Sequence, residues 1–186
     1  MVVLPTDTVY GLGCDPDRHT AVERLYELKG RPSDRPAAVM FFALASAMQA
    51  LPELAPRERA AMRALLPGPV TLLLPNRARR FPLACGSDPS TVGVRVPRLG
   101  DELAALGGVD RPLLQSSANL SGEAEARRLT DVPRGLLERV DLVLDGGELP
   151  GVPSTVVDLR DYQQAGTWSV VREGALDPGA LEHGLG

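Results

Sequence analysis

The stretch "TVGVRVP", from Thr91 to Pro97, decides what kind of sheet this chain can form. Valines occupy every second position from Val92 to Val96, and Arg95 lies on the opposite side of the same extended segment. Another apolar run, "PVTLLLP" at 69–75, precedes it, and no helical pattern separates the two. Because a strictly alternating parallel sheet would need a helix between them, we predict a mixed α/β sheet.

The rest of the chain intersperses further strand and helix patterns with this pair. Short apolar runs predict strands at 1–4, 37–42 and 141–147, one starting at Pro112, and a hairpin formed by 154–159 and 167–174. Helical spacing, with proline or glycine at the boundaries, predicts helices at 19–28, 43–51, 56–66, 101–106, 133–140 and 177–183. There is no internal repeat and no linker, so residues 1–186 are expected to form one domain.

The composition is that of a globular protein whose core is built from small side chains. Of 186 residues, 44% are hydrophobic but only 4% are aromatic, so Ala, Val and Leu must fill the interior. The formal net charge of -4 counts against a general nucleic-acid binder, whose binding domain is usually basic. A local basic cleft is still compatible with this charge.

Several common site types are excluded because their motifs are missing. Cys14 and Cys85 form no CxxC pair, which argues against a zinc site and for a reducing, cytoplasmic setting. We find no signal peptide and no run near the roughly 20 apolar residues of a membrane helix, so no membrane partner is expected. There is no P-loop and no GxSxG motif. His19 and His183 lie near the two ends, which gives a Ser-His-Asp or Cys-His hydrolase little support.

A cluster of cations follows the first predicted helix. The stretch "LYELKGRPSDRP" holds Lys29, the only lysine of the chain, followed by Arg31 and Arg35. A guanidinium makes bidentate contacts to phosphate or carboxylate, whereas an ammonium is a compact point charge. The combination suits a polyphosphate undergoing chemistry. The alternative is a solvated loop at a helix C-terminus, where the helix dipole mildly favours cations, and spacing alone leaves both open.

Hydroxyl groups and one further arginine stand at the ends of several predicted strands. Arg95 is either a solvent-facing side chain or a clamp for a carboxylate or phosphate on the open face of the sheet, because a buried arginine needs a partner. "SSANLSG" (116–122), "PTDTVYGLG" (5–13) and "PSTVVDL" (153–159) place Ser, Thr and Asn beside strand ends. Such loops either form ordinary turns and caps or bind anions and ribose at the strand ends of α/β sheets.

In this order, the motifs resemble those of the YrdC/Sua5 family, the threonylcarbamoyl-AMP synthases. The similar segments are "PTDTVYGLGCD", "LKGRPSDRP", "PGPVTLLLP", "VGVRVP", "SSANLSG" and "STVVDL", which run from about Pro5 to about Arg172. A set of six ordered motifs is far more specific than any one of them. The resemblance implies a YrdC-like twisted open mixed sheet, flanked by helices, with a large positively charged concave cavity.

The resemblance also implies a reaction. Members of this family combine L-threonine, bicarbonate or CO2, and ATP to give threonylcarbamoyl-AMP and pyrophosphate, with Mg2+ accompanying ATP as the cofactor. A tRNA threonylcarbamoyltransferase complex then moves the threonylcarbamoyl group to an adenosine of tRNA. We therefore expect an ATP-using nucleotidyltransferase in threonylcarbamoyladenosine synthesis, with no dedicated metal ligands in the protein.

The motifs carry the family's site residues over to this chain one by one. ATP would be held by Lys29, Arg31, Arg35, Thr91, Asn119, Arg127 and Arg172, with Lys29 and Arg31 as catalytic residues. Threonine would be held by Thr8, Arg95, Ser117 and Ser154, with Arg95 on its carboxylate. Lys29 and Arg31 would lie against the phosphates, where charge builds as the carbamate oxygen attacks the α-phosphorus.

Three features depart from the family pattern. Members usually carry more chain before "PTDT", a helix and most of a strand, so we expect this layer to be reduced. Met40 stands where many members have a histidine at the threonine site, and a thioether is a weak hydrogen-bond acceptor. Arg128 stands next to Arg127, so either guanidinium could reach the nucleotide.

Two other functions compete with the adenylate synthase. One is a module that binds double-stranded RNA or tRNA on a basic concave face of the same fold, against which the net acidity and scarce aromatics count. The other is a carbamoyl-transfer domain of related fold that uses carbamoyl phosphate. Those domains usually sit in larger chains with zinc-binding modules, which are absent from this sequence.

Overall fold

The centre of the molecule is one open sheet of nine strands. The computed structural model describes residues 1–186, with the side chain of Glu102 left out of the description. The strand order is β7-β1-β2-β6-β3-β5-β4-β8-β9. Their bounds are β1 Val2–Leu4, β2 Gly11–Cys14, β3 Ala38–Met40, β4 Val70–Pro75, β5 Thr91–Arg95, β6 Leu113–Ser117, β7 Leu142–Val143, β8 Thr155–Asp158 and β9 Ser169–Arg172.

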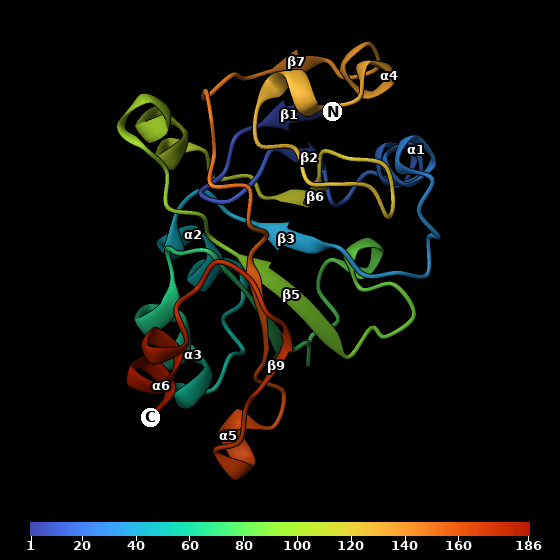
Figure 1. Ribbon diagram of the computed structural model, residues 1–186. Helices are drawn as coiled ribbons and strands as arrows, with labels where there is room; N and C mark the ends of the chain where they lie inside the picture. The colour runs from blue at the N-terminus through green and yellow to red at the C-terminus, as the bar shows by residue number, and fades with distance from the viewer.

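The sheet is mixed, as the consecutive strands β4 and β5 predicted. These two pair antiparallel, and Arg95 lies opposite Thr71. β3 pairs parallel with β5, and β4 pairs parallel with β8. The predicted hairpin is also confirmed, since β8 and β9 pair antiparallel at one edge. Figure 1 shows the N-terminus near the β7 edge and the C-terminus on the opposite half of the molecule.

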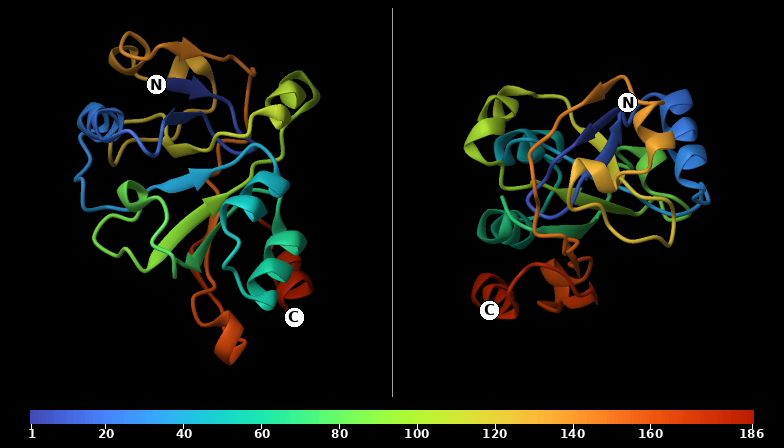
Figure 2. Two further views of the ribbon diagram at one scale, coloured as in Figure 1. Left: turned by 180° about the vertical axis from the view of Figure 1, so that it is seen from behind. Right: turned by 45° about the horizontal axis from the view of Figure 1, so that its top comes forward.

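Helices pack against the sheet in two places. The α-helices are α1 His19–Lys29, α2 Leu44–Ala50, α3 Pro56–Leu65, α4 Arg134–Leu137, α5 Tyr162–Ala165 and α6 Pro178–Leu185. Three short 3-10 helices, Pro82–Ala84, Asp101–Gly108 and Leu129–Asp131, lie in the connections. Figure 2 shows α2, α3 and α6 grouped together, and α1 near the other half of the sheet. Among the described residues, no helix has the length and apolar character needed to cross a membrane.

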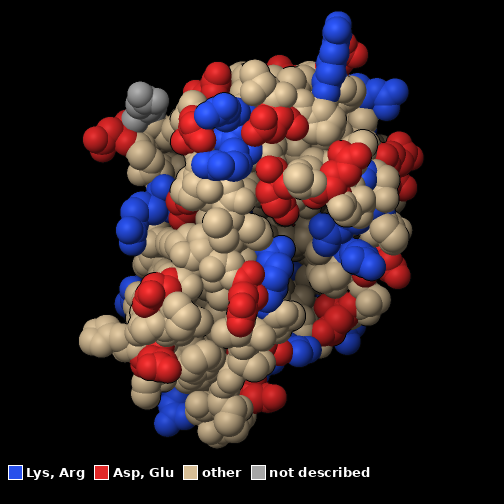
Figure 3. All heavy atoms as spheres, viewed as in Figure 1, with Lys and Arg blue, Asp and Glu red and all other residues tan. Residues whose placement is uncertain are grey.

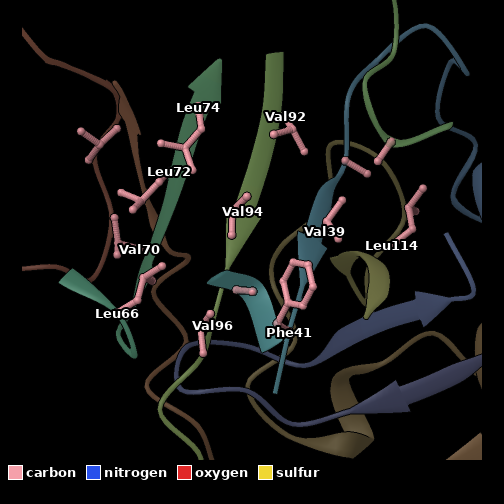
Figure 4. Packing of buried hydrophobic residues seen from close by; sticks show 14 of the residues in the cluster. Val39, Phe41, Leu66, Val70, Leu72, Leu74, Val92, Val94, Val96 and Leu114 are labelled. Carbon is pink, nitrogen blue, oxygen red and sulfur yellow. The ribbon is translucent and has the colours of Figure 1, made fainter. Parts of the chain in front are cut away.

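The core lies between the sheet and these helices. Met62 and Leu65 of α3 and Leu181 of α6 are buried in one cluster with the valines and leucines of the central strands. Figure 4 shows residues of this cluster in and next to the central strands: Val39, Phe41, Leu66, Val70, Leu72, Leu74, Val92, Val94, Val96 and Leu114. Burying such side chains stabilises a fold by about 1.5–3 kcal/mol each relative to exposure. The small-residue core expected from the composition is therefore present.

Alternation along the central strands gives the sheet two different faces. In β5, Val92 and Val94 join the core, whereas Thr91 and Arg95 point to the other side and line a cavity. In β4, Leu72 joins the core and its neighbours Thr71 and Leu73 line the same cavity. Because successive side chains of a strand point to opposite faces, the apolar periodicity that builds the core also selects the residues of the cavity.

Some predicted elements differ from the structure. β2 was not predicted as a strand, because its sequence "GLGC" has low β propensity. A Cβ atom on Gly11 would lie 2.8 Å from Nε2 of Gln115, so the neighbouring strand occupies the space of a side chain. The segment predicted as a helix at 101–106 forms a 3-10 helix. The helix predicted at 133–140 and the strand predicted at 141–147 are both shorter than expected.

Candidate functional site

A cavity of about 460 Å³ lies over the face of the sheet that points away from α2, α3 and α6. Its described lining comes from β3, β4, β5, β6, β8 and β9 and from the loops that connect the elements. The charged residues of this lining are Arg31, Arg95, Arg160, Arg172, Asp88 and Glu125. A pocket of this size with a few convergent polar groups is the usual form of a small-molecule site.

Arg95 is buried at the end of β5, with only 4% of its surface exposed. Its Nη2 atom lies 2.9 Å from Oδ1 of Asp7 and 3.0 Å from Oγ1 of Thr6, and it also contacts Oγ1 of Thr8. Its Nε atom is buried without a hydrogen-bond partner among the described residues. One side of the guanidinium is therefore held by the 6–8 loop, while the Nε–H group still lacks an acceptor among the described residues.

Arg31 enters the cavity from the loop after α1. Its Nη1 atom donates to Oγ of Ser116 at 3.2 Å, and its guanidinium lies 5.9 Å from the ring centroid of Tyr26. Its Nε atom is also buried and unpaired within the described part of the chain. Burial lowers the pKa of Arg31, and the nearby cations Arg35 and Arg172 lower it further. Since a guanidinium stays protonated, this direction indicates a positive charge that an anion would stabilise.

Lys29 is more deeply buried than the sequence suggested. Its Nζ atom donates to the backbone carbonyls of Ser117 and Asn119, the latter at 2.7 Å, and to Oδ1 of Asn119 at 3.2 Å. Burial lowers the pKa of Lys29 to about 8, and the carboxylate of Glu125 opposes this shift. The ammonium thus holds the turn after β6 through its carbonyl groups. Lys29 itself is not part of the described lining of the cavity.

Ser154 and Arg172 meet on the opposite wall. Nη2 of Arg172 donates to the backbone carbonyl of Ser154 at 2.7 Å, and Oγ of Ser154 lies 2.9 Å from Oγ1 of Thr71. Burial lowers the pKa of Arg172, Arg95 lowers it further, and Glu125 raises it. Arg31, Arg95 and Arg172 therefore act on one another as like charges around a single cavity.

The structure brings about half of the predicted site residues to the cavity wall. The lining includes Arg31, Thr91, Arg95, Ser117, Ser154 and Arg172. Thr8 and Asn119 lie one layer behind it, because Thr8 contacts Arg95 and Asn119 accepts from Lys29.

Arg35 and Arg127 are exposed and lie outside the described lining. Arg127 and Arg128 both reach the carboxylate of Glu148, at 3.0 and 2.6 Å. The ambiguity between these two arginines therefore persists in the structure.

Met40 is fully buried and lies opposite Arg95 in the pairing of β3 with β5. It packs with Leu4 and Phe42 in a small second apolar cluster. Met40, which departs from the family pattern, is thus the neighbour of Arg95 in the sheet, and both side chains are buried.

Sequence reasoning missed several residues of the lining, among them Thr71, Asp88, Glu125 and Arg160. Period-2 alternation in "VTLLLP" could have found Thr71 on the side opposite Leu72. Asp88 and Glu125 lie in loops without periodicity, so no local signal marked them.

Acidic and basic side chains are mixed on the surface of the molecule. Figure 3 shows acidic and basic side chains interspersed on the face seen in Figure 1, and no broad region of one sign dominates that view.

Comparison with known proteins agrees with this geometry. A family model for Sua5, YciO and YrdC proteins, described as "Telomere recombination", matches residues 1–174. A threonylcarbamoyl-AMP synthase of Vibrio vulnificus is 36% identical over 170 residues, which are 88% of this chain and 89% of that protein. A threonylcarbamoyl-AMP synthase of Pyrococcus abyssi is 32% identical over an alignment of 188 positions, which covers 100% of this chain and 54% of that protein.

A solved structure is similar over the full length of the chain. The structure of Pyrococcus abyssi Sua5 complexed with L-threonine superposes with a TM-score of 0.83 at 31% identity, over 100% of this chain and 53% of that one. The chain thus spans about half the length of the Pyrococcus abyssi protein. The fold and the site define an α/β protein with an arginine-lined cavity on the open face of a mixed sheet. The chain belongs to the Sua5, YciO and YrdC family.

Proposed function

We propose that this protein is an L-threonylcarbamoyladenylate synthase, which converts L-threonine, bicarbonate or CO2, and ATP to threonylcarbamoyl-AMP and pyrophosphate. The observation that carries the proposal is the convergence of separate motifs on one cavity, where Arg31, Thr91, Arg95, Ser117, Ser154 and Arg172 all reach the wall. The Vibrio vulnificus relative, which this chain covers over most of its length, carries the same activity in its name.

The nucleotide is assigned to the wall formed by the 29–35 loop, β5 and β9. Arg31 and Arg172 face the triphosphate, and Thr91 and Asn119 hold the remainder of ATP. Lys29 adds its charge from beneath the turn after β6. Arg35 and Arg127 would have to turn toward the cavity, which is inexpensive because exposed ion pairs such as Arg127 with Glu148 contribute about 0–1 kcal/mol.

Threonine is assigned to the half of the cavity around Arg95. The unpaired Nε of Arg95 would donate to its carboxylate, with Thr8 and Asp7 fixing the other side of the guanidinium. Ser117 and Ser154 supply hydroxyl groups on the two adjacent walls. Met40, beside Arg95 in the sheet, is fully buried outside the described lining and offers the ligand no strong hydrogen bond.

Catalysis in this site consists of positioning and electrostatic stabilisation. The carbamate formed from threonine is held against the α-phosphorus, and its oxygen attacks while pyrophosphate leaves. Arg31 and Lys29 stabilise the charge that develops on the phosphate oxygens. A cationic environment also lowers the pKa of the threonine amine, which must be neutral to react.

ATP would bring its Mg2+ into the cavity as part of the substrate. No group of three His, Cys, Asp or Glu side chains among the described residues could hold a metal ion. The oxygens of Asp88 already accept from Ser90 and Thr91. Phosphate oxygens would therefore be the main ligands of this ion, as is common for Mg2+. The adenylate would then pass to a tRNA threonylcarbamoyltransferase complex.

Pyrophosphate release tests the proposal directly. The purified protein is incubated with ATP, Mg2+ and bicarbonate, with and without L-threonine. We expect release that requires both threonine and bicarbonate. Threonine-independent release, or none from a folded protein that binds ATP, would contradict the assignment. Carbamoyl phosphate in place of threonine and bicarbonate distinguishes the related carbamoyl-transfer reaction, and a titration with double-stranded RNA at two salt concentrations tests the RNA-binding alternative.

A further inference from the structure

Glu125 brings a carboxylate with one unpaired oxygen to the wall of the cavity. It lies on the loop after β6, lines the cavity, and its Oε2 atom is buried without a hydrogen-bond partner among the described residues. A buried acceptor without a partner costs about 1–3 kcal/mol, and more when it is charged. Glu125 is therefore a side chain whose partner is expected to be a ligand.

The other carboxylate of the lining differs in this respect. Asp88 accepts from the backbone N–H of Ser90 at 3.0 Å and from Oγ1 of Thr91 at 2.6 Å, and Arg160 lies 3.8 Å from it. These contacts account for Asp88 as part of a turn at the start of β5. No comparable contact accounts for Oε2 of Glu125 in the described part of the chain.

The anionic groups of the proposed substrates account for the arginines in the cavity, but they do not account for the carboxylate of Glu125. Triphosphate, bicarbonate and the carboxylate of threonine would all be repelled by Glu125. The groups of the substrates that can donate to it are the α-ammonium and the β-hydroxyl of threonine, the hydroxyls of the ribose and the amino group of the adenine. Of these, only the ammonium carries a positive charge.

The neighbours of Glu125 connect it to the amino-acid half of the cavity as well as to the nucleotide. Glu125 acts on the charges of Lys29 and of Arg172. Lys29 donates to the carbonyl of Ser117, and Arg172 donates to that of Ser154. Each of these two cations, which are assigned above to ATP, thus also contacts one serine assigned to threonine, so Glu125 lies where the two halves of the cavity meet.

We propose that Glu125 receives the α-ammonium group of the amino-acid substrate and makes the site selective for amino acids over hydroxy acids. This inference rests on the proposed function, because it concerns the threonine half of the same cavity. Arg95 and Glu125 would then bind the two charged groups of a zwitterion, the carboxylate and the ammonium. A carboxylate–ammonium contact of this kind is charge-assisted, and it fixes the amine at one point of the cavity. It favours the protonated amine, against the effect of the arginines, so it describes the binding step, and the amine loses its proton before it reacts.

Calorimetric titration of the whole chain tests this without ATP or Mg2+. L-Threonine is titrated into the wild type, Glu125→Gln and the control Glu123→Gln, which changes an exposed carboxylate on the same loop. The second probe is 2,3-dihydroxybutanoate, in which a hydroxyl replaces the ammonium. We expect Glu125→Gln to weaken threonine binding about tenfold or more, as for the loss of a hydrogen bond to a charged group. Glu123→Gln should stay within about twofold of the wild type. The dihydroxy acid should bind the wild type and Glu125→Gln alike.

The outcomes separate the inference from the function on which it rests. If the wild type binds threonine and Glu125→Gln binds it equally well, the inference is wrong and the proposed function stands. A separate titration of the same proteins with ATP and Mg2+ completes the test: if Glu125→Gln weakens only this binding, the carboxylate serves the nucleotide or its metal and the inference is wrong. If the wild type binds ATP but no threonine, the proposed function fails together with the inference. Matching thermal unfolding curves of the three proteins exclude a folding defect as the cause.

Discussion

Oδ1 of Asp7 lies 2.9 Å from Nη2 of Arg95, and Oδ2 of the same carboxylate accepts from the backbone N–H of Arg98 at 2.9 Å. One side chain from the loop after β1 therefore holds both the last residue of β5 and the segment that leaves it. The ion pair is largely dry, because the two side chains are 4% and 10% exposed. Asp7 thus fixes the guanidinium that faces the cavity.

Replacing Asp7 should destabilise the fold, because it leaves the charge of Arg95 buried without its partner. We expect Asp7→Ala to lower the free energy of unfolding by about 3 kcal/mol, as for breaking one half of a buried ion pair. Adding Arg95→Met removes the orphaned charge, so the double variant should be more stable than the sum of the single effects predicts. Urea denaturation of the four proteins measures this. Additive effects would mean that the pair contributes nothing as a pair.

Arg31 and Arg95 should affect different substrates. Arg31→Ala is expected to reduce adenylate formation by at least about a hundredfold, the scale of losing one electrostatic group at a reacting centre. Arg95→Ala should mainly raise the apparent KM for threonine while leaving that for ATP nearly unchanged. Steady-state kinetics with each substrate varied in turn checks both. If Arg95→Ala weakens ATP instead, the two halves of the cavity are reversed.

Lys29 should make stability depend on pH. Its pKa in the fold is about 8, against 10.5 ordinarily, so between these values the folded state releases a proton that the unfolded chain retains. The unfolded state then binds more protons, and stability rises with pH in this window. Relative to Lys29→Met, the wild type should gain on the order of 2 kcal/mol between pH 7 and pH 10. Urea denaturation at both pH values measures the difference, and a difference independent of pH would show that Lys29 titrates normally.

Gly86 should tolerate no side chain, since it lies against the loop that carries Arg31. It has φ of 58°, and a Cβ atom there would lie 2.3 Å from the carbonyl oxygen of Asp34 and 2.7 Å from the nitrogen of Pro36. Gly30 has the same φ, but no described atom lies within 4 Å of its Cβ position. Both alanine variants pay about 1 kcal/mol for the left-handed backbone.

Only Gly86→Ala must also displace backbone, so we expect it to cost at least about 2 kcal/mol more than Gly30→Ala and to weaken ATP binding as well. Thermal unfolding and nucleotide titration of the two variants provide the comparison. Equal losses would show that the 31–36 loop moves away without resistance.

Much of the fold could be predicted because the apolar periodicity of this chain is strong. The valines of β5, the run of β4 and the glycine after α1 each carry a local signal, and all three lie where expected. β2 could not be predicted, because its glycines are required by the neighbouring strand and not by local propensity. Tertiary contacts decide such elements.

The site was predictable only in part, for the same reason. Arg95 could be singled out, since a guanidinium on the side opposite a valine row needs a partner. Its partner Asp7 could not, because the two are brought together by strands that are far apart in the sequence. The burial of Lys29 likewise depends on the turn after β6. The family resemblance supplied candidate residues, but not which of them reach the cavity wall.

The alternation along β4 and β5 has a consequence for how this chain can change. Residues that set the stability of the interior and residues that meet the ligand occupy interleaved odd and even positions of the same strands. Substitutions at Thr71, Leu73 or Thr91 can therefore alter what the cavity accepts without repacking the interior behind it. A combinatorial library restricted to these positions would sample new ligand preferences on an unchanged scaffold, and selection could act on chemistry and on folding separately.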